Sequence, residues 1–124
     1  MFRHRCFAFS NGTQNDINSL LTNAGLSQFF QDIVVVDDMP IPFFKPHPEI
    51  YKYLINQTDS VESNTWLISS NPFDIIGAAN CGWNTAWMRR SEDVVFGPWP
   101  NVNAPTVTVR SFSDLKDAIE NHAQ

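Results

Sequence analysis

Short apolar runs recur along this sequence and alternate with segments whose apolar residues have helical spacing. Runs of strand length and composition occur at 6–9, 33–36, 66–68, 85–88 and 106–109. Helical spacing occurs at about 15–23, from 48, from 72 and after 111. Strands separated by helices predict βαβ units, right-handed crossovers and a mostly parallel sheet, so the expected fold class is α/β.

The run from Ile33 to Val36 is the clearest strand, since its residues are β-branched and uninterrupted by polar side chains. That composition is typical of a parallel strand covered on both faces. The segment that follows, 39–48, contains four prolines and predicts a stiff, extended loop rather than a regular element. Pro48 is expected to open the next helix, and Leu26 and Phe29 predict one extra helical turn earlier in the chain.

The stretch from Trp66 to Asp74 changes from a buried strand to a helix through Ser69, Ser70 and Asn71. Polar side chains at the carboxyl end of a strand line the crevice where open α/β sheets bind ligands. Serine, asparagine and aspartate are equally common as helix caps. Taken alone, this stretch therefore indicates a binding site and a simple cap with about equal weight.

Composition limits the class of protein and of partner. The 124 residues fit one domain, 1–124, with a single core. Eight basic against thirteen acidic residues give a net charge of −5, which argues against nucleic acid or anionic membrane as partners. The sequence shows no apolar run near the roughly 20 residues of a membrane span and no signal-peptide pattern, so we expect a cytoplasmic protein. Cys6 and Cys81 lie in apolar segments, which predicts buried, reduced thiols.

Polar residues follow three of the predicted strands. Ser10-Asn11-Gly12-Thr13 follows the first, Lys45 lies in the proline loop after the second, and the segment 69–74 follows the third. In a parallel sheet these loops share one edge, and a lysine with carboxylate and amide partners suits a small anion or an activated water. Each residue also has a structural interpretation: Ser10 as a cap, Lys45 as a solvated lysine, Asp74 as a structural partner of Lys45. Their joint placement favours a site.

These motifs, in this order, resemble the haloacid dehalogenase (HAD) superfamily, and within it the type II L-2-haloacid dehalogenases. The resemblance is carried by the following segments: Ser10-Asn11-Gly12-Thr13, Lys45-Pro46-His47-Pro48-Glu49-Ile50-Tyr51, Ser69-Ser70-Asn71-x-x-Asp74, Gly77-Ala78 and Gly82-Trp83-x-Thr85-Ala86-Trp87. The proline loop before Lys45 is slightly longer than the family's usual form. The resemblance implies a Rossmann-like three-layer core and hydrolysis of a small 2-haloalkanoic acid, without cofactor or metal.

The resemblance also implies roles for individual residues. The residues expected to be catalytic, by supplying charge and positioning the hydrolytic water, are Lys45, Asp74, Ser69 and Asn71; those expected to bind or support the substrate carboxylate are Ser10, Asn11 and Tyr51. Phosphatase members of the superfamily carry a metal-binding aspartate four residues before the position of Asp74, where this chain has Ser70. Magnesium prefers carboxylate ligands, so a phosphatase-like relative is the least favoured alternative.

The resemblance also implies a nucleophilic aspartate at the end of a strand that precedes the strand at Phe7, and a cap domain inserted between those two strands. None of these 124 residues matches either part. Because covalent catalysis needs its nucleophile, we expect a truncated core that is inactive alone. The strands at Phe7 and Leu67 would then expose edges that invite pairing. The sequence leaves open closure of the gap, a homodimer, or pairing with a separate N-terminal half. The rival interpretation is a non-enzymatic protein that binds a small anion or another protein.

Overall fold

The computed structural model describes residues 4–96, 99 and 103–122. Its internal contacts divide the chain into two compact units, Met1–Thr58 and Asp59–Gln124, and each is described by itself. The single domain expected from length stays a prediction. Within the described ranges, no helix has the length and apolar character needed to cross a membrane.

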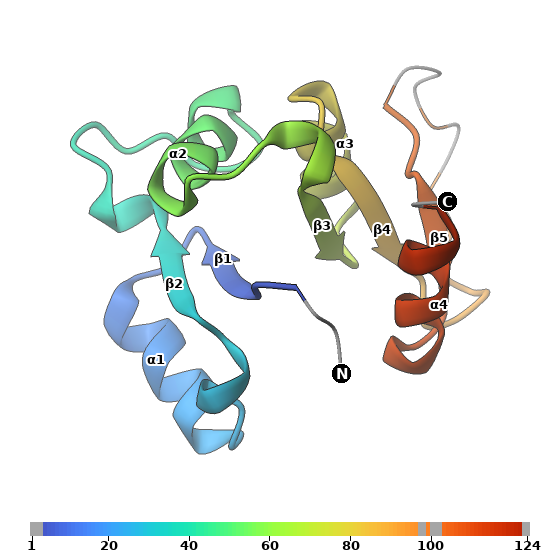
Figure 1. Ribbon diagram of the computed structural model, residues 1–124, viewed down its shortest axis with the longest axis horizontal. Helices are drawn as coiled ribbons and strands as arrows, with labels where there is room; N and C mark the ends of the chain where they lie inside the picture. The colour runs from blue at the N-terminus through green and yellow to red at the C-terminus, as the bar shows by residue number, and fades with distance from the viewer. Residues whose placement is uncertain (1–3, 97–98, 100–102, 123–124) are drawn as a thin grey trace. The chain divides into compact units, whose positions relative to one another are not determined.

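The first unit alternates strands and helices in the predicted order. Its elements are β1 (Phe7–Ser10), α1 (Gln14–Asn23), the 3-10 turn η1 (Ser27–Phe29), β2 (Asp32–Val35), the 3-10 turn η2 (Val36–Asp38) and α2 (Pro48–Thr58). β1 and β2 lie side by side and parallel, with Phe7 opposite Asp32 and Ser10 opposite Val35 (Figure 1). The extra turn predicted after α1 is present as η1, and it is a 3-10 turn.

The boundaries of these elements follow from local chemistry. Thr13 caps α1, because its hydroxyl oxygen accepts a hydrogen bond from the Asp16 backbone N–H. The predicted strand at 33–36 begins and ends one residue earlier than expected, since Val36 already belongs to η2. Val34, Val35 and Val36 are all buried, as the unbroken apolar run predicts.

The second unit contains a three-stranded parallel sheet with the order β3-β4-β5. Its elements are the 3-10 turn η3 (Glu62–Asn64), β3 (Trp66–Ser69), α3 (Pro72–Asn80), β4 (Asn84–Met88), β5 (Val107–Val109) and α4 (Phe112–His122). α3 packs on β3 and β4, and α4 packs on β5 (Figure 1). Ile75, Ala78 and Ala86 are fully buried and form part of the core of this unit.

Every strand pair in both sheets is parallel, so the predicted α/β class and parallel pairing are confirmed. The prediction that the two cysteines are buried is wrong, because both residues are half-buried. Cys6 precedes the first residue of β1, and Cys81 is the C-cap of α3, so each lies at the end of an element rather than inside it.

Candidate functional site

The loop after β1 is folded by its own side chains. The hydroxyl oxygen of Ser10 accepts a hydrogen bond from the Gly12 backbone N–H at 2.9 Å. The interpretation of Ser10 as the cap of α1 is wrong, because Thr13 has that role. A Cβ added to Gly12 would lie 3.3 Å from Ser10 Oγ and 3.5 Å from Ile17 Cδ1, so glycine lets the loop approach the helix closely.

Lys45 is bound to the β1 strand and to the loop after it. Its backbone N–H donates to Asn11 Oδ1 at 2.8 Å, and its Nζ donates to the carbonyl oxygen of Phe9 at 2.9 Å. The side chain is half-buried. Lys45 is therefore not a solvated loop lysine, and the first two of the three predicted polar loops do meet.

Tyr51 reaches this cluster through Phe9. The two rings meet edge to face, with centroids 5.6 Å apart and planes at 73°. Tyr51 has no exposed surface and lies on α2, whose first turn follows the proline loop. An aromatic pair of this geometry fixes both rings, so Tyr51 supports the strand residue that contacts Lys45.

In the second unit, the predicted segment forms the junction between β3 and α3. Asn71 is the N-cap of α3: its Oδ1 accepts from the Phe73 backbone N–H at 2.9 Å, and Pro72 follows in the first turn. Ser69 Oγ accepts from the Asn71 backbone N–H at 3.0 Å. The cap interpretation is thus confirmed for Asn71, which does not exclude a role in a site, because the amide nitrogen still offers donors. Asp74 is buried in the first turn of the helix.

An aromatic cluster links the end of β4 to the first turn of α3, and sequence reasoning missed it. Trp87 Nε1 donates to the Ser70 carbonyl at 3.1 Å. The ring pairs are Phe73–Phe96 at 5.6 Å, Phe96–Trp99 at 4.7 Å and Trp87–Trp99 at 5.0 Å between centroids. The available signal was the presence of Phe96 and Trp99 in an otherwise polar, proline-rich loop.

The predicted site residues therefore fall into two groups. In the first unit, Asn11 and Tyr51 are linked to Lys45, Tyr51 through Phe9, and Ser10 lies between Phe9 and Asn11 in the chain. Ser69, Asn71 and Asp74 form the strand–helix junction of the second unit. The meeting of both groups around one ligand stays a prediction, as do the roles assigned to the individual residues.

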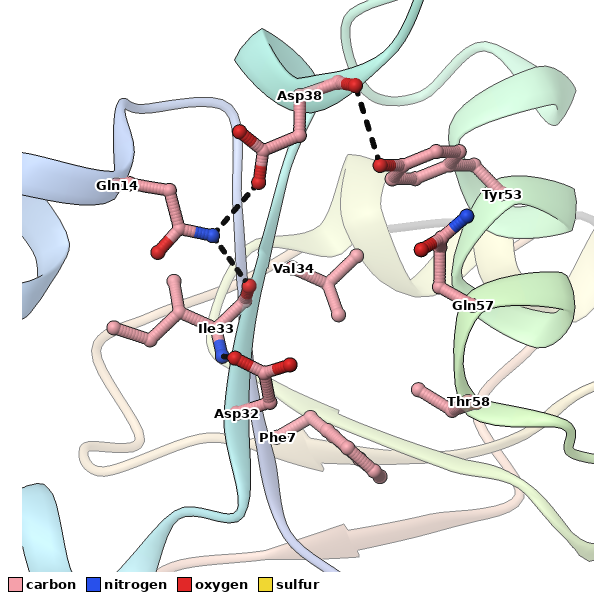
Figure 2. A pocket seen from close by; sticks show the side chains of 9 residues that line it. All are labelled: Phe7, Gln14, Asp32, Ile33, Val34, Asp38, Tyr53, Gln57 and Thr58. Atoms are coloured by element: carbon pink, nitrogen blue, oxygen red, sulfur yellow. Dashed lines mark hydrogen bonds between the residues drawn. The ribbon is translucent and has the colours of Figure 1, made fainter.

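A separate polar cavity of about 120 Å³ lies in the first unit, between β2 and α2 (Figure 2). Gln14 Nε2 donates to the Ile33 carbonyl oxygen and to Asp38 Oδ2, each at 2.7 Å, and Tyr53 OH donates to the Asp38 carbonyl oxygen at 3.3 Å. Partial burial raises the pKa of the Tyr53 phenol above its ordinary value of 10.0, and the negative charge of Asp38 raises it further. The predicted site residues do not line this cavity; its lining residues are Phe7, Gln14, Asp32, Ile33, Val34, Asp38, Tyr53, Gln57 and Thr58.

Comparison with known proteins gives consistent matches. Residues 3–88 match the family model described as haloacid dehalogenase-like hydrolase. The (S)-2-haloacid dehalogenase 2 of Pseudomonas sp. (strain CBS-3) is 32% identical over 84 residues, which are 68% of this chain and 36% of that protein. The (S)-2-haloacid dehalogenase of Pseudomonas putida is 26% identical over 113 residues, 90% of this chain and 47% of that protein.

Among solved structures, the L-2-haloacid dehalogenase of Xanthobacter autotrophicus with covalently bound chloropropionic acid is similar, with a TM-score of 0.80 and 26% identity. The match covers 94% of this chain and 55% of that structure. The chain thus spans between about a third and a half of the length of the curated relatives it matches.

Proposed function

The chain belongs to the haloacid dehalogenase-like hydrolase family, and on this premise we propose that it forms part of a hydrolase that acts on small 2-haloalkanoic acids. The observation that carries this proposal is the connected cluster of Asn11, Lys45 and Phe9, which places an ammonium beside the loop after β1. Curated proteins similar to this chain are named (S)-2-haloacid dehalogenases, and one similar solved structure holds a covalently bound chloropropionic acid.

Three polar residues of the first unit have roles in this proposal. The Lys45 ammonium attracts the substrate carboxylate and supplies positive charge beside the reacting centre. The hydroxyl of Ser10 accepts from Gly12, and its own proton remains to be donated to a carboxylate oxygen. Asn11 uses its oxygen for the Lys45 backbone, which leaves its amide nitrogen to donate to the substrate.

The residues of the β3–α3 junction, in the second unit, also have roles in this proposal. Asp74 orients the hydrolytic water, while Ser69 and Asn71 hold that water by hydrogen bonds. Ser70 stands where phosphatases of the superfamily carry a carboxylate, so magnesium would lack a ligand it prefers. The proposal therefore needs no metal. Titration of the chain with magnesium, followed by NMR of the Ser70 and Asp74 amides, should leave both signals unshifted. A saturable shift would contradict the proposal.

The covalent step needs an aspartate nucleophile that matches no residue of these 124 in the expected place. We therefore propose that these 124 residues alone release no halide, and that addition of the N-terminal half of a related enzyme restores the reaction. β1 pairs with β2 and β3 with β4, and in the part of the chain that the structure describes neither β1 nor β3 has a second strand neighbour. Open strand edges of this kind favour pairing with another chain.

The test compares binding and turnover in one series. We expect (S)-2-chloropropionate to shift the amide signals of Asn11 and Lys45, and Lys45→Ala to weaken binding at least about tenfold, as loss of a charge-assisted contact predicts. Lys52→Ala is the matched control, because Lys52 is an exposed lysine paired with Glu49 on α2. Halide release should appear only after addition of the N-terminal half of the Pseudomonas relative. Absence of binding to the wild-type chain would contradict the function, and halide release by the chain alone would contradict the need for a partner.

A second candidate is a non-enzymatic protein that binds a small anion or self-associates, and the same open edges favour it. Light scattering after size-exclusion chromatography separates the two. A stable homodimer that binds the anion but gains no activity with the N-terminal half would support this candidate. A monomer that becomes active on complementation would exclude it.

A further inference from the structure

Phe9 contacts the Lys45 ammonium in two ways. Lys45 Nζ lies 3.9 Å from the centroid of the Phe9 ring and donates to the carbonyl oxygen of the same residue at 2.9 Å. The first contact is a cation–π interaction and the second is a charge-assisted hydrogen bond. One residue therefore holds the ammonium both by its backbone and by its side chain.

The Phe9 ring is itself held in place. Its edge-to-face partner Tyr51 is fully buried on α2. The backbone of Phe9 is in register with Val34 of β2, so the pairing of β1 with β2 fixes the backbone position of Phe9 as well. A ring anchored in this way presents a fixed face to the ammonium, which an exposed and rotating ring would not do.

The ring contributes something that the backbone alone does not. Any residue at position 9 would offer the same carbonyl oxygen, but only an aromatic side chain offers a negative π face. Phe7, two residues earlier on β1, has the Arg5 guanidinium 5.6 Å from its ring centroid and serves as a comparison on the same strand.

We propose that Phe9 is a positioning residue for Lys45 and that the face of the Phe9 ring holds the ammonium beside the loop after β1. The purpose of this arrangement rests on the proposed function, in which Lys45 binds the substrate carboxylate. The contact itself is independent of any substrate and can be tested without one.

The first experiment measures the reactivity of Lys45 toward trinitrobenzenesulfonate, with the modified peptide quantified by mass spectrometry. Modification requires the amine to lose its proton and leave both contacts with Phe9. Stepwise fluorination of Phe9 by incorporated fluorophenylalanines weakens the π face and barely changes the packing. We expect the modification rate of Lys45 to rise with each added fluorine, by roughly two- to fivefold overall as the loss of one cation–π contact predicts. A rate that does not change with fluorination would overturn the proposal.

The second experiment measures the affinity for (S)-2-chloropropionate. Phe9→Leu should weaken binding by roughly two- to fivefold, whereas Phe9→Tyr and the control Phe7→Leu should bind as the wild type does. Equal losses in Phe9→Tyr and Phe9→Leu would show a packing effect and overturn the proposal. If the wild-type chain does not bind the acid, the proposed function fails, while the fluorination series still decides whether Phe9 positions Lys45.

Discussion

Gln14 donates a hydrogen bond from Nε2 to the carbonyl oxygen of Ile33 at 2.7 Å and thereby caps the edge of β2 that faces away from β1 (Figure 2). The backbone N–H of Ile33 donates to Asp32 Oδ1 at 2.8 Å. In a parallel ladder both backbone groups of alternate residues point to the same side. The outward-facing groups of Ile33 are therefore bonded to side chains, which protects this edge against strand addition.

Replacement of Gln14 by alanine should open the β2 edge. We expect Gln14→Ala to lower the free energy of unfolding by about 1 kcal/mol through the lost hydrogen bonds, and to increase self-association. Urea denaturation and light scattering measure these two effects. Asn18→Ala, at an exposed position of the same helix, is the control. Unchanged association of Gln14→Ala over a range of protein concentrations would show that the edge is protected by other means.

Asn71 should behave as a helix cap in its contribution to stability. Asn71→Ala removes the acceptor of the Phe73 backbone N–H and should lower the free energy of unfolding by about 1 kcal/mol. Asn71→Asp and Asn71→Ser keep an acceptor and should restore most of that loss. The exposed Asn80 ends the same helix, and Asn80→Ala provides the comparison. If all three Asn71 variants lose equal stability, the cap does not explain the role of this residue.

The sequence predicted the elements of the fold because their signals are local. Strand composition at 33–36, the proline at the start of α3 and the hydroxyl or amide before each helix depend on neighbouring residues only. The contact between Asn11 and Lys45 was also within reach, since both follow strands that proved to be neighbours. The aromatic cluster of Phe73, Phe96 and Trp99 could not be predicted, because ring pairs made by a long loop leave no periodic pattern in the sequence.

The same reasoning explains the failures at individual residues. Ser10 and Thr13 are both hydroxyl residues before α1, and composition alone does not say which one caps it. Cys6 and Cys81 were expected to be buried from their apolar neighbours, but burial depends on position within an element. The cavity beside Tyr53 depends on side chains from β1, α1, β2 and α2, whose packing no local pattern specifies.

Tyr53 should make stability depend on pH in the alkaline range. Its phenol has a raised pKa in the folded chain because of burial and the charge of Asp38. Between the ordinary value of 10.0 and the raised value, the folded state binds more protons than the unfolded state, so stability falls as pH rises. Below pH 10 the phenol is protonated in both the folded and the unfolded state, so its full contribution to the free energy of unfolding is present. We expect the free energy of unfolding of Tyr53→Phe to fall less steeply above pH 10 than that of the wild type. Parallel curves for the two proteins would contradict the assignment.

The Asn11 side chain should order the proline loop. Asn11→Ala removes the acceptor of the Lys45 backbone N–H at 2.8 Å, so this amide should exchange its hydrogen with solvent several-fold faster. Hydrogen exchange followed by NMR measures the Lys45 amide directly. Asn15→Ala, at an exposed position in the first turn of α1, should leave the exchange rate unchanged. An unchanged Lys45 rate in Asn11→Ala would mean that the loop is ordered by its other contacts.

Gly82 should be required because of its backbone conformation, and not because a larger side chain would lack space. Its φ is +87°, in the region that favours glycine, whereas the nearest atom to an added Cβ is Glu62 Cβ at an ordinary 3.8 Å. Gly82→Ala should therefore lower the free energy of unfolding by about 1 kcal/mol through backbone strain. Gly82→Asn, although larger, should cost less, because asparagine tolerates this region. Urea denaturation distinguishes the two causes: a greater loss in Gly82→Asn than in Gly82→Ala would point to crowding beside Glu62.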